Sequence, residues 1–385
     1  MRVAVNGWFL IHHPHTGSGQ YLRALLEWLP RVAPEHEYHV VLPVASVPPA
    51  LAATAAAQGW RAVAVKAGDS NLAKVWFEQV SFPRAAGRLK ADVAHVPYWG
   101  PPLSSPAPLV VTVHDLIPRL LPEYRGGRAV QLYTALVSAA TTGATLVLTD
   151  SNASAHDITA QLQVPAERIR TVYLAAGPQY TPKGDWQVDD PIRRKYGLED
   201  EGYVLYLGGF DRRKNVGGLL SAWTWASGSI GQGYPLVIGG QLPAPDSPHY
   251  EDYPAKAAEL EIADTVKFIG PVDEADKPAL YRGALAFGYP SKYEGFGLPP
   301  LEAMACGVPV VTTTGGSLPE VMGSAGYLIP ADDTRTFGAA LLTIVVEPSV
   351  HDDLRARGLA QAQQFSWEKA ARETAAAYAD ALKAK

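Results

Sequence analysis

The stretch ALAFGYPSKYEGFGLPPLEAMACGVPVVTT, residues 284–313, combines a strand pattern, a glycine turn, a helix pattern and a second strand pattern. The apolar runs 284–289 and 308–313 have the composition of buried strands, and the helical pattern between them has prolines at its entry and Gly307 after its end. This order predicts a right-handed crossover in a parallel sheet. The link KYEGFGL therefore lies at the carboxyl edge of the sheet, where folds of this kind bind ligands.

The same alternation of strand and helix patterns continues along the chain in two series. In the first series, apolar runs typical of parallel strands occupy residues 2–6, 39–43, 61–65, 92–96, 109–113, 145–149 and 170–174. In the second series, they occupy residues 203–207, 235–239, 266–270, 284–289, 308–313 and 326–330. Residues 177–191 contain proline and glycine, lack periodicity and separate the two series as a linker. We therefore predict an α/β protein with two Rossmann-like domains, over residues 1–178 and 179–365, whose parallel sheets face each other across a cleft.

The composition is that of a folded protein with more than one domain. The chain has 385 residues, of which 47% are hydrophobic and 18% are charged. Its net charge of −5 gives no general basic field, so no nucleic-acid partner is expected. Cys306 is the single cysteine, which excludes an internal disulfide and a cysteine zinc site.

The sequence gives no signal for export or for a membrane span. Its start, MRVAVNGWFL, fits a buried first strand better than a signal peptide. No run approaches the roughly 18 uninterrupted apolar residues that a membrane span needs. We therefore expect a cytoplasmic protein, and peripheral contact with the inner face of a membrane stays open.

Two glutamates, Glu294 and Glu302, flank the glycine turn in an almost uncharged stretch. Glycines let a ligand approach the backbone, and the free N–H groups and dipole of a helix entry favour an anion, so this turn suits a phosphate group. The alternative is a tight turn in which Glu302 merely compensates the helix dipole. The segment taken alone supports both interpretations equally.

A second glycine turn favours the functional interpretation. The stretch LYLGGFDRRKNV, residues 205–216, again joins a strand to a helix, and Arg212, Arg213 and Lys214 cluster beside its glycines. Three cations at the start of a helix oppose the helix dipole. This local conflict favours an anionic ligand such as a diphosphate over a solvated helix start.

The loop after the first strand, HHPHTGSGQYL (residues 12–22), contains Gly17 and Gly19. Leu22 occupies the third position of the dinucleotide fingerprint, so a dehydrogenase-type site is not supported. The three histidines of this loop have no carboxylate nearby in sequence, and we expect no metal site.

Residues His114 and Asp115 end another apolar strand, in the stretch LVVTVHDLIPRLLPEY over residues 109–124. In α/β folds, catalytic and ligand-binding residues lie at the carboxyl ends of the strands. A histidine that only satisfies backbone groups at the strand end is an equally good interpretation.

Together these motifs resemble those of family 4 of the glycosyltransferases, whose architecture of two Rossmann-like domains is called GT-B. The E-x7-E motif is present as Glu294 to Glu302, and the other matching stretches are GGFDRRKNV, TGSGQYL, TVHDLIPRLLPEY, SLPEV and FSWEKAARET. The resemblance spans nearly the whole chain. Asn6, where relatives often have aspartate, and Lys292, where an apolar residue is common, depart from the pattern.

The resemblance implies a role for each charged residue. Glu302 would bind both ribose hydroxyls of a nucleotide diphosphate sugar, and Glu294 would contact hydroxyls of the transferred sugar. Arg213 and Lys214 would neutralise the diphosphate leaving group. His114 would touch the donor sugar near the reacting carbon.

Backbone and loop positions complete the implied donor site. Amides around Gly295, Phe296, Gly297 and Leu298 would lie near the sugar and its phosphate. Gly17 and Gly19 would close over the phosphates from the other domain, and the strand-end loop around Val272 would face the base. The last helix, over residues 366–385, would cross back to the first domain.

The implied activity is that of a retaining hexosyltransferase that needs no metal and no cofactor. Fixed cations and helix N–H groups can stabilise a departing nucleoside diphosphate, and no convincing D-x-D motif is present. The signatures are similar to those of mannosyltransferases of polysaccharide assembly, which suggests GDP-mannose as the donor. A glycan or a lipid-linked molecule would be the acceptor.

Two other functions are compatible with this architecture. A non-catalytic nucleotide-sugar-binding protein could lack Glu294 or His114, and both residues are present. A sugar-nucleotide epimerase is disfavoured by the E-x7-E segment. Residues 71–90, which mix aromatic and basic side chains, are the candidate for contact with a lipid-linked acceptor or a membrane, although a helix packed on the sheet explains them more simply.

Overall fold

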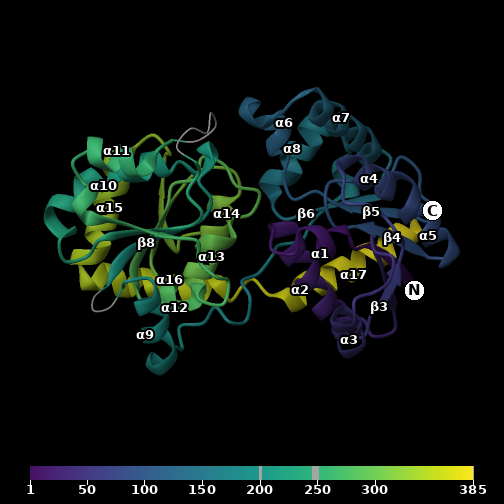
Figure 1. Cartoon of the computed structure of the whole chain (residues 1–385), viewed down its shortest axis with the longest axis horizontal. Helices are drawn as coiled ribbons and strands as arrows, with labels where there is room; N and C mark the ends of the chain where they lie inside the picture. The colour runs from purple at the N-terminus through teal and green to yellow at the C-terminus, as the bar shows by residue number, and fades with distance from the viewer. Residues whose placement is uncertain (199–201, 245–250, 385) are drawn as a thin grey trace. The chain divides into compact units, whose positions relative to one another are not determined.

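The computed structural model describes residues 1–198, 202–244 and 251–384, and it contains two α/β units with parallel sheets, as predicted (Figure 1). Unit 1 comprises Met1–Leu174 and Ser366–Lys385, and unit 2 comprises Ala175–Phe365. Every predicted strand is present, with ends that shift by at most a few residues. None of the described helices is both long and apolar enough to cross a membrane.

Unit 1 is built on a sheet with the strand order β3-β2-β1-β4-β5-β6-β7. Its strands are β1 (Arg2–Asn6), β2 (Glu37–Leu42), β3 (Arg61–Ala64), β4 (Val93–Val96), β5 (Leu109–Thr112), β6 (Leu146–Thr149) and β7 (Ile169–Thr171). Its helices are α1 (Trp8–His12), α2 (Gly17–Val32), α3 (Pro49–Gln58), α4 (Asn71–Trp76), α5 (Phe82–Arg88), α6 (Ile117–Leu120), α7 (Arg128–Thr142), α8 (Asn152–Leu162) and α17 (Trp367–Lys383). A single π-helical turn, Phe77–Ser81, joins α4 to α5.

Unit 2 is built on a sheet with the strand order β10-β9-β8-β11-β12-β13. Its strands are β8 (Tyr203–Leu207), β9 (Leu236–Gly239), β10 (Val266–Gly270), β11 (Ala284–Tyr289), β12 (Val310–Thr313) and β13 (Gly326–Ile329). Its helices are α9 (Trp186–Lys195), α10 (Val216–Ile230), α11 (Tyr253–Glu259), α12 (Lys277–Arg282), α13 (Leu298–Ala305), α14 (Leu318–Met322), α15 (Thr334–Val346) and α16 (Pro348–Ala362).

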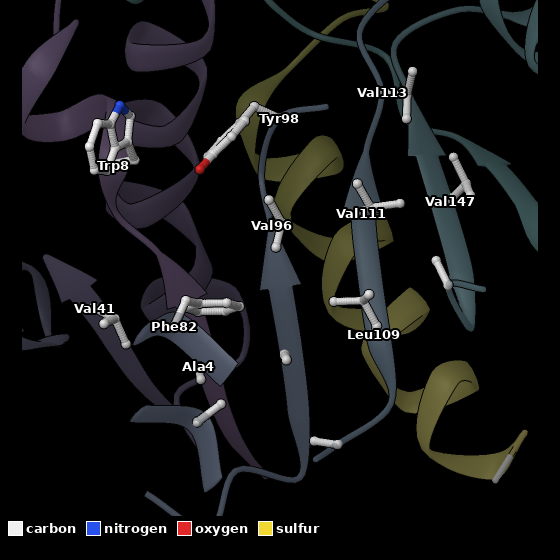
Figure 2. Packing of buried hydrophobic residues seen from close by; sticks show 14 of the residues in the cluster. Ala4, Trp8, Val41, Phe82, Val96, Tyr98, Leu109, Val111, Val113 and Val147 are labelled. Carbon is white, nitrogen blue, oxygen red and sulfur yellow. The ribbon is translucent and has the colours of Figure 1, made fainter. Parts of the chain in front are cut away.

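The core of unit 1 lies on its sheet because successive valines of the central strands are buried on both faces. Figure 2 shows Val96, Val111 and Val147 on neighbouring strands, with Trp8 and Tyr98 beyond the strand ends. Tyr98 follows β4, and the order of the strands reverses between β1 and β4. Such a switch point opens a crevice at the carboxyl edge of the sheet, where Tyr98 lies.

The C-terminal helix α17 belongs to unit 1, although it follows unit 2 in sequence. It lies beside α2 (Figure 1) and contacts β4, β5 and β6. The buried His95 fixes it, because Nδ1 of His95 lies 2.8 Å from the Tyr378 hydroxyl and Nε2 lies 2.9 Å from Thr112 Oγ1. Burial lowers the pKa of His95 to about 3, so this link is made by a neutral ring.

The predicted linker over residues 177–191 is partly wrong. Helix α9 begins inside it at Trp186, where the side chain of Asp185 accepts a hydrogen bond of 2.9 Å from the backbone N–H of Gln187. This cap starts the helix in spite of Pro191. The strongly polar sequence hid the helix, because only Asp189 and no apolar side chain of α9 is buried.

Candidate active site

The loops that follow β8 and β11 meet at the point where the strand order of unit 2 reverses. The loop after β8 carries Arg213 and Lys214, and the loop after β11 carries Glu294. The Lys292 N–H donates a 2.8 Å hydrogen bond to the Arg213 carbonyl, and Arg213 Nη1 donates one of 2.8 Å to the Tyr293 carbonyl. The two predicted motifs are therefore one structural unit at the carboxyl edge of the sheet, where ligands of such folds bind.

Arg213 and Lys214 both form ion pairs with Glu294. Nη1 of Arg213 lies 2.8 Å from Oε2, and Nζ of Lys214 lies 2.8 Å from Oε1 of the same carboxylate. All three side chains are largely buried, with 10–13% of their surface exposed. Tyr289 completes the cluster, because its hydroxyl is 3.0 Å from Glu294 Oε1 and 2.5 Å from Lys214 Nζ.

These two cations stabilise the ionised form of Glu294. Burial opposes ionisation of this carboxyl, but the Lys214 and Arg213 charges outweigh it and lower its pKa to about 2. The cluster contains two cations and the Glu294 carboxylate, and Asp211 adds a second carboxylate in a longer ion pair, 3.5 Å from Arg213 Nε. Guanidinium and ammonium groups fixed in this way can also bind a phosphate oxygen beside Glu294.

The turn between the two glutamates has a backbone conformation that requires glycine. Gly297 has φ of +106°, a region that side chains rarely adopt, and it directly precedes α13. A Cβ atom at this position would also lie 2.9 Å from Leu318 Cδ2. Gly295, Phe296 and Gly297 are buried, and Leu298 is partly buried as the first residue of α13.

The loop after β12 supports this turn, and sequence reasoning missed its role. Ser317 Oγ lies 3.0 Å from the Glu294 carbonyl and 2.5 Å from the Phe296 carbonyl, so its one proton is shared between these two acceptors. A Cβ atom at Gly315 or Gly316 would overlap the backbone of the loop that carries Glu294. The signal was available, since a pair of glycines follows a predicted strand end.

Glu302 lies in a different environment from Glu294. It is buried on α13, and the Tyr281 hydroxyl donates a 3.1 Å hydrogen bond to its Oε2. Burial raises its pKa to about 6, against the pull of the Lys277 charge. In the described part of the chain, no cation lies within ion-pair distance of this carboxylate. The two glutamates thus differ in charge stability, and Glu302 keeps hydrogen-bonding capacity for a ligand.

Val272 lies in the loop after β10 and is partly buried. A Cβ atom at Gly239, the last residue of β9, would lie 3.0 Å from Val272 Cγ2. Val272 is therefore at the same carboxyl edge of the unit 2 sheet as the Glu294 cluster.

The predicted residues of unit 1 are Gly17, Gly19 and His114. Gly17 starts α2 and is exposed, and a Cβ atom there would meet no atom within 4 Å. Gly19 is buried, and a Cβ atom there would overlap the carbonyl of His13, so this glycine is required by its own loop. Gly17 therefore leaves its backbone open to a ligand, whereas the need for Gly19 is structural.

His114 has a partner that the sequence did not suggest. Its Nδ1 lies 2.7 Å from Oδ2 of Asp150, which follows β6. Asp115, the neighbour in sequence, instead accepts a 3.0 Å hydrogen bond from the Ile117 N–H. Among the described residues, no group of three or more His, Cys, Asp or Glu side chains could hold a metal ion.

Comparisons with known proteins agree with these motifs. The family described as "Glycosyl transferases group 1" matches residues 188–361, and "Glycosyltransferase Family 4" matches residues 15–176. The O-antigen chain mannosyltransferase B of Escherichia coli is 37% identical over 299 residues, which cover 77% of each chain. The serotype-specific mannosyltransferase WbdA of Escherichia coli is 28% identical over 68% of this chain, and the match covers 32% of that longer protein.

Solved structures with the same fold cover nearly the whole chain. The sucrose-phosphate synthase from Thermosynechococcus elongatus has a TM-score of 0.75 at 20% identity and covers 100% of both chains. Anabaena Alr3699/HepE, solved in complex with UDP and glucose, has a TM-score of 0.74 at 17% identity and covers 99% of this chain and 100% of that chain. With the two family matches and the 37% identical relative, they confirm the predicted architecture and family: the chain belongs to family 4 of the glycosyltransferases, with the GT-B fold.

Proposed function

We propose that this glycosyltransferase is a retaining, metal-independent mannosyltransferase that moves mannose from GDP-mannose to a glycan or lipid-linked acceptor. The observation that carries the proposal is the buried cluster in which Arg213 and Lys214 share the carboxylate of Glu294. Mannose is proposed because the relatives that match over most of this chain are named mannosyltransferases.

The Glu294 cluster can stabilise the negative charge of the leaving group, as a bound metal ion does in other enzymes. A departing nucleoside diphosphate gains negative charge on its phosphate oxygens, and Arg213 and Lys214 are fixed beside Glu294 by their ion pairs. Preorganised cations stabilise such charge without reorganisation during the reaction. At the start of α13, the backbone N–H of Leu298 supplies one further donor to an anion, whereas Pro299 and Pro300 have no N–H.

The two glutamates are assigned to opposite ends of the donor. Glu294 lies next to the cations, so we assign it to the hydroxyls of the sugar that is transferred. Glu302 is buried next to the hydroxyls of Tyr281 and Tyr180, and we assign its carboxyl group to the ribose hydroxyls. Val272, on the loop after β10, is assigned to the base.

Retention of the anomeric configuration follows from the family resemblance. In this mechanism the bond between the anomeric carbon and the phosphate oxygen breaks, and the acceptor oxygen bonds to that carbon on the same face. The departing phosphate oxygen takes the proton of the acceptor hydroxyl. The cluster supports departure of the phosphate, because Arg213 and Lys214 can stabilise the negative charge that develops on its oxygens.

The acceptor is assigned to unit 1, at the segment of residues 71–90. Leu72 and Trp76 of α4 are 83% and 61% exposed, whereas Phe77 and Phe82 are buried in the core. Only the α4 part of this segment therefore offers apolar surface, which supports contact with a lipid-linked acceptor or with the inner face of a membrane. The rest of the segment packs on the sheet, the simpler of the two explanations that its sequence allows.

A panel of nucleotide sugars tests the proposal. The protein is incubated with GDP-mannose, UDP-glucose, UDP-galactose and UDP-N-acetylglucosamine, and both thermal stabilisation and release of nucleoside diphosphate are measured. We expect GDP-mannose to give the largest effect, with the effect kept in excess chelator. Preference for a uridine donor would contradict the donor assignment, and a change of the donor sugar without an acceptor would indicate an epimerase.

A further inference from the structure

The strand register of unit 1 brings His114 and Asp150 together. Strands β5 and β6 pair in parallel, with Val110 opposite Leu146 and Thr112 opposite Leu148. The same offset of 36 residues places His114 opposite Asp150, directly beyond the two strand ends. The contact is therefore built into the sheet and does not depend on a flexible loop.

This pair defines which nitrogen of His114 carries a proton. Nδ1 lies 2.7 Å from Asp150 Oδ2, and a carboxylate can only accept, so Nδ1 is the donor. Asp150 is 3% exposed, and the Tyr21 ring packs edge-on against the imidazole with 4.9 Å between ring centroids. Nε2 of His114 is buried and has no hydrogen-bond partner of normal geometry among the residues that the structure describes, although the Pro97 carbonyl also raises the pKa of the ring. The ring is thus held on one side and left unsatisfied on the other.

We propose that Asp150 is a positioning residue for sugar transfer: it fixes His114 as the Nδ1–H tautomer and leaves the Nε2 lone pair to accept a hydrogen bond from a hydroxyl of the donor sugar. The role of Nε2 rests on the proposed function. The orientation of the His114 ring is set by its contacts with Asp150 and Tyr21. An accepted hydrogen bond raises the electron density of the sugar as positive charge develops at its reacting carbon.

The neighbouring groups determine when His114 loses this role. Burial alone would lower its pKa, but the Asp150 carboxylate outweighs burial and raises the pKa above 6.5, with a smaller contribution from Asp115. Burial and the charge of His114 lower the pKa of His95, and burial raises the pKa of Tyr21, so both neighbouring side chains stay neutral. As the pH falls through the raised pKa, Nε2 gains a proton and can no longer accept.

The substitution Asp150→Asn separates position from charge. The side chain keeps its size, but an amide can donate as well as accept, so the preference for one tautomer is lost and the pKa of His114 falls. Asp115→Asn is the matched control, because it removes a carboxylate next to the same ring but leaves the Asp150 contact in place. The test is nitrogen-15 NMR of the imidazoles across pH, with His114 assigned by its absence in His114→Gln.

We expect wild type and Asp115→Asn to show His114 as the Nδ1–H form above its pKa. We expect Asp150→Asn to show a large Nε2–H fraction and a lower pKa. A wild-type His114 in the Nε2–H form would overturn the proposal, as would an Asp150→Asn spectrum identical to wild type. If Asp150→Asn does not fold, the wild-type tautomer alone decides.

Kinetics distinguish a positioning role from a structural one. We expect Asp150→Asn to lower kcat roughly 10- to 100-fold, with donor KM within about threefold, and to move the acid limb of kcat to lower pH. An altered tautomer with unchanged kcat would refute the positioning role. If wild type transfers no sugar from any donor, the proposed function fails, and the NMR result still decides whether Asp150 orients His114.

Discussion

Replacing Glu294 with glutamine should destabilise the free protein, because it leaves two buried cations without their shared carboxylate. The change keeps the size and the hydrogen-bonding oxygen of the side chain but removes its charge. The shift of the Glu294 pKa from 4.5 to about 2 corresponds to roughly 3 kcal/mol in favour of the charged form in the folded state. Removal of one partner from a buried ion pair typically costs about 3–5 kcal/mol, which agrees.

The matched control is the same substitution at Glu302. The pKa of Glu302 is raised to about 6, so at pH 7.5 its charge disfavours the folded state by roughly 2 kcal/mol. Glutamine removes this penalty and can still accept the hydrogen bond from Tyr281. Glu294→Gln should therefore lower the melting temperature of unit 2, and Glu302→Gln should leave it unchanged or raise it.

The assay is thermal unfolding at pH 7.5, followed by fluorescence, with and without GDP and without divalent metal. For a domain of this size, a loss of about 3 kcal/mol corresponds to a decrease of roughly 6–12 °C. GDP should stabilise Glu294→Gln by more degrees than wild type, because its phosphates supply the missing negative charge to Arg213 and Lys214. Equal melting temperatures for wild type and Glu294→Gln, or a GDP effect that is smaller in the variant, would refute the charge balance described for the cluster.

Three further predictions concern catalysis. Glu302 gains a proton as the pH falls through about 6, so initial rates should show that donor KM rises below that pH in wild type and does not change with pH in Glu302→Gln. A wild-type donor KM that does not change with pH would contradict the assignment of Glu302 to the ribose site. Excess chelator should leave transfer within about twofold of its rate in buffer, because fixed cations hold the diphosphate; activity that is lost and then restored by magnesium or manganese would contradict this. The product should keep the anomeric configuration of the donor, as shown by NMR of its anomeric proton, and an inverted product would exclude the retaining mechanism.

The sequence was sufficient for the fold because hydrophobic runs and glycine turns are local features. Each predicted strand is present in the two parallel sheets, since continuous valine- and leucine-rich segments can be buried only when both faces are covered. Helix α9 was missed because its sequence is strongly polar and it buries no apolar side chain. Capping by Asp185 was the available signal.

The composition of the candidate site could be predicted, but its pairing could not. The residues Arg213, Lys214 and Glu294 were identified separately, and only the adjacency of β8 and β11 shows that they form one charge cluster. The pairing of Asp150 with His114 could not be predicted for the same reason, because it depends on the register between β5 and β6. Contacts between residues far apart in sequence require the strand order and register, which periodicity alone does not give.

The central claim is that one glycine-containing segment holds both ends of the donor, with Glu294 at the reacting sugar and Glu302 at the ribose. Steady-state kinetics of Glu294→Ala and Glu302→Ala at varied donor concentration, with folding checked by circular dichroism, test it most directly. We predict that Glu294→Ala mainly lowers kcat, by about 10²–10³-fold, because its contact strengthens in the transition state. Glu302→Ala should mainly raise donor KM, because its contact is similar in ground and transition states. If Glu294→Ala raises only KM and Glu302→Ala lowers only kcat, the two roles are reversed. Unchanged kinetics in both variants would contradict the account.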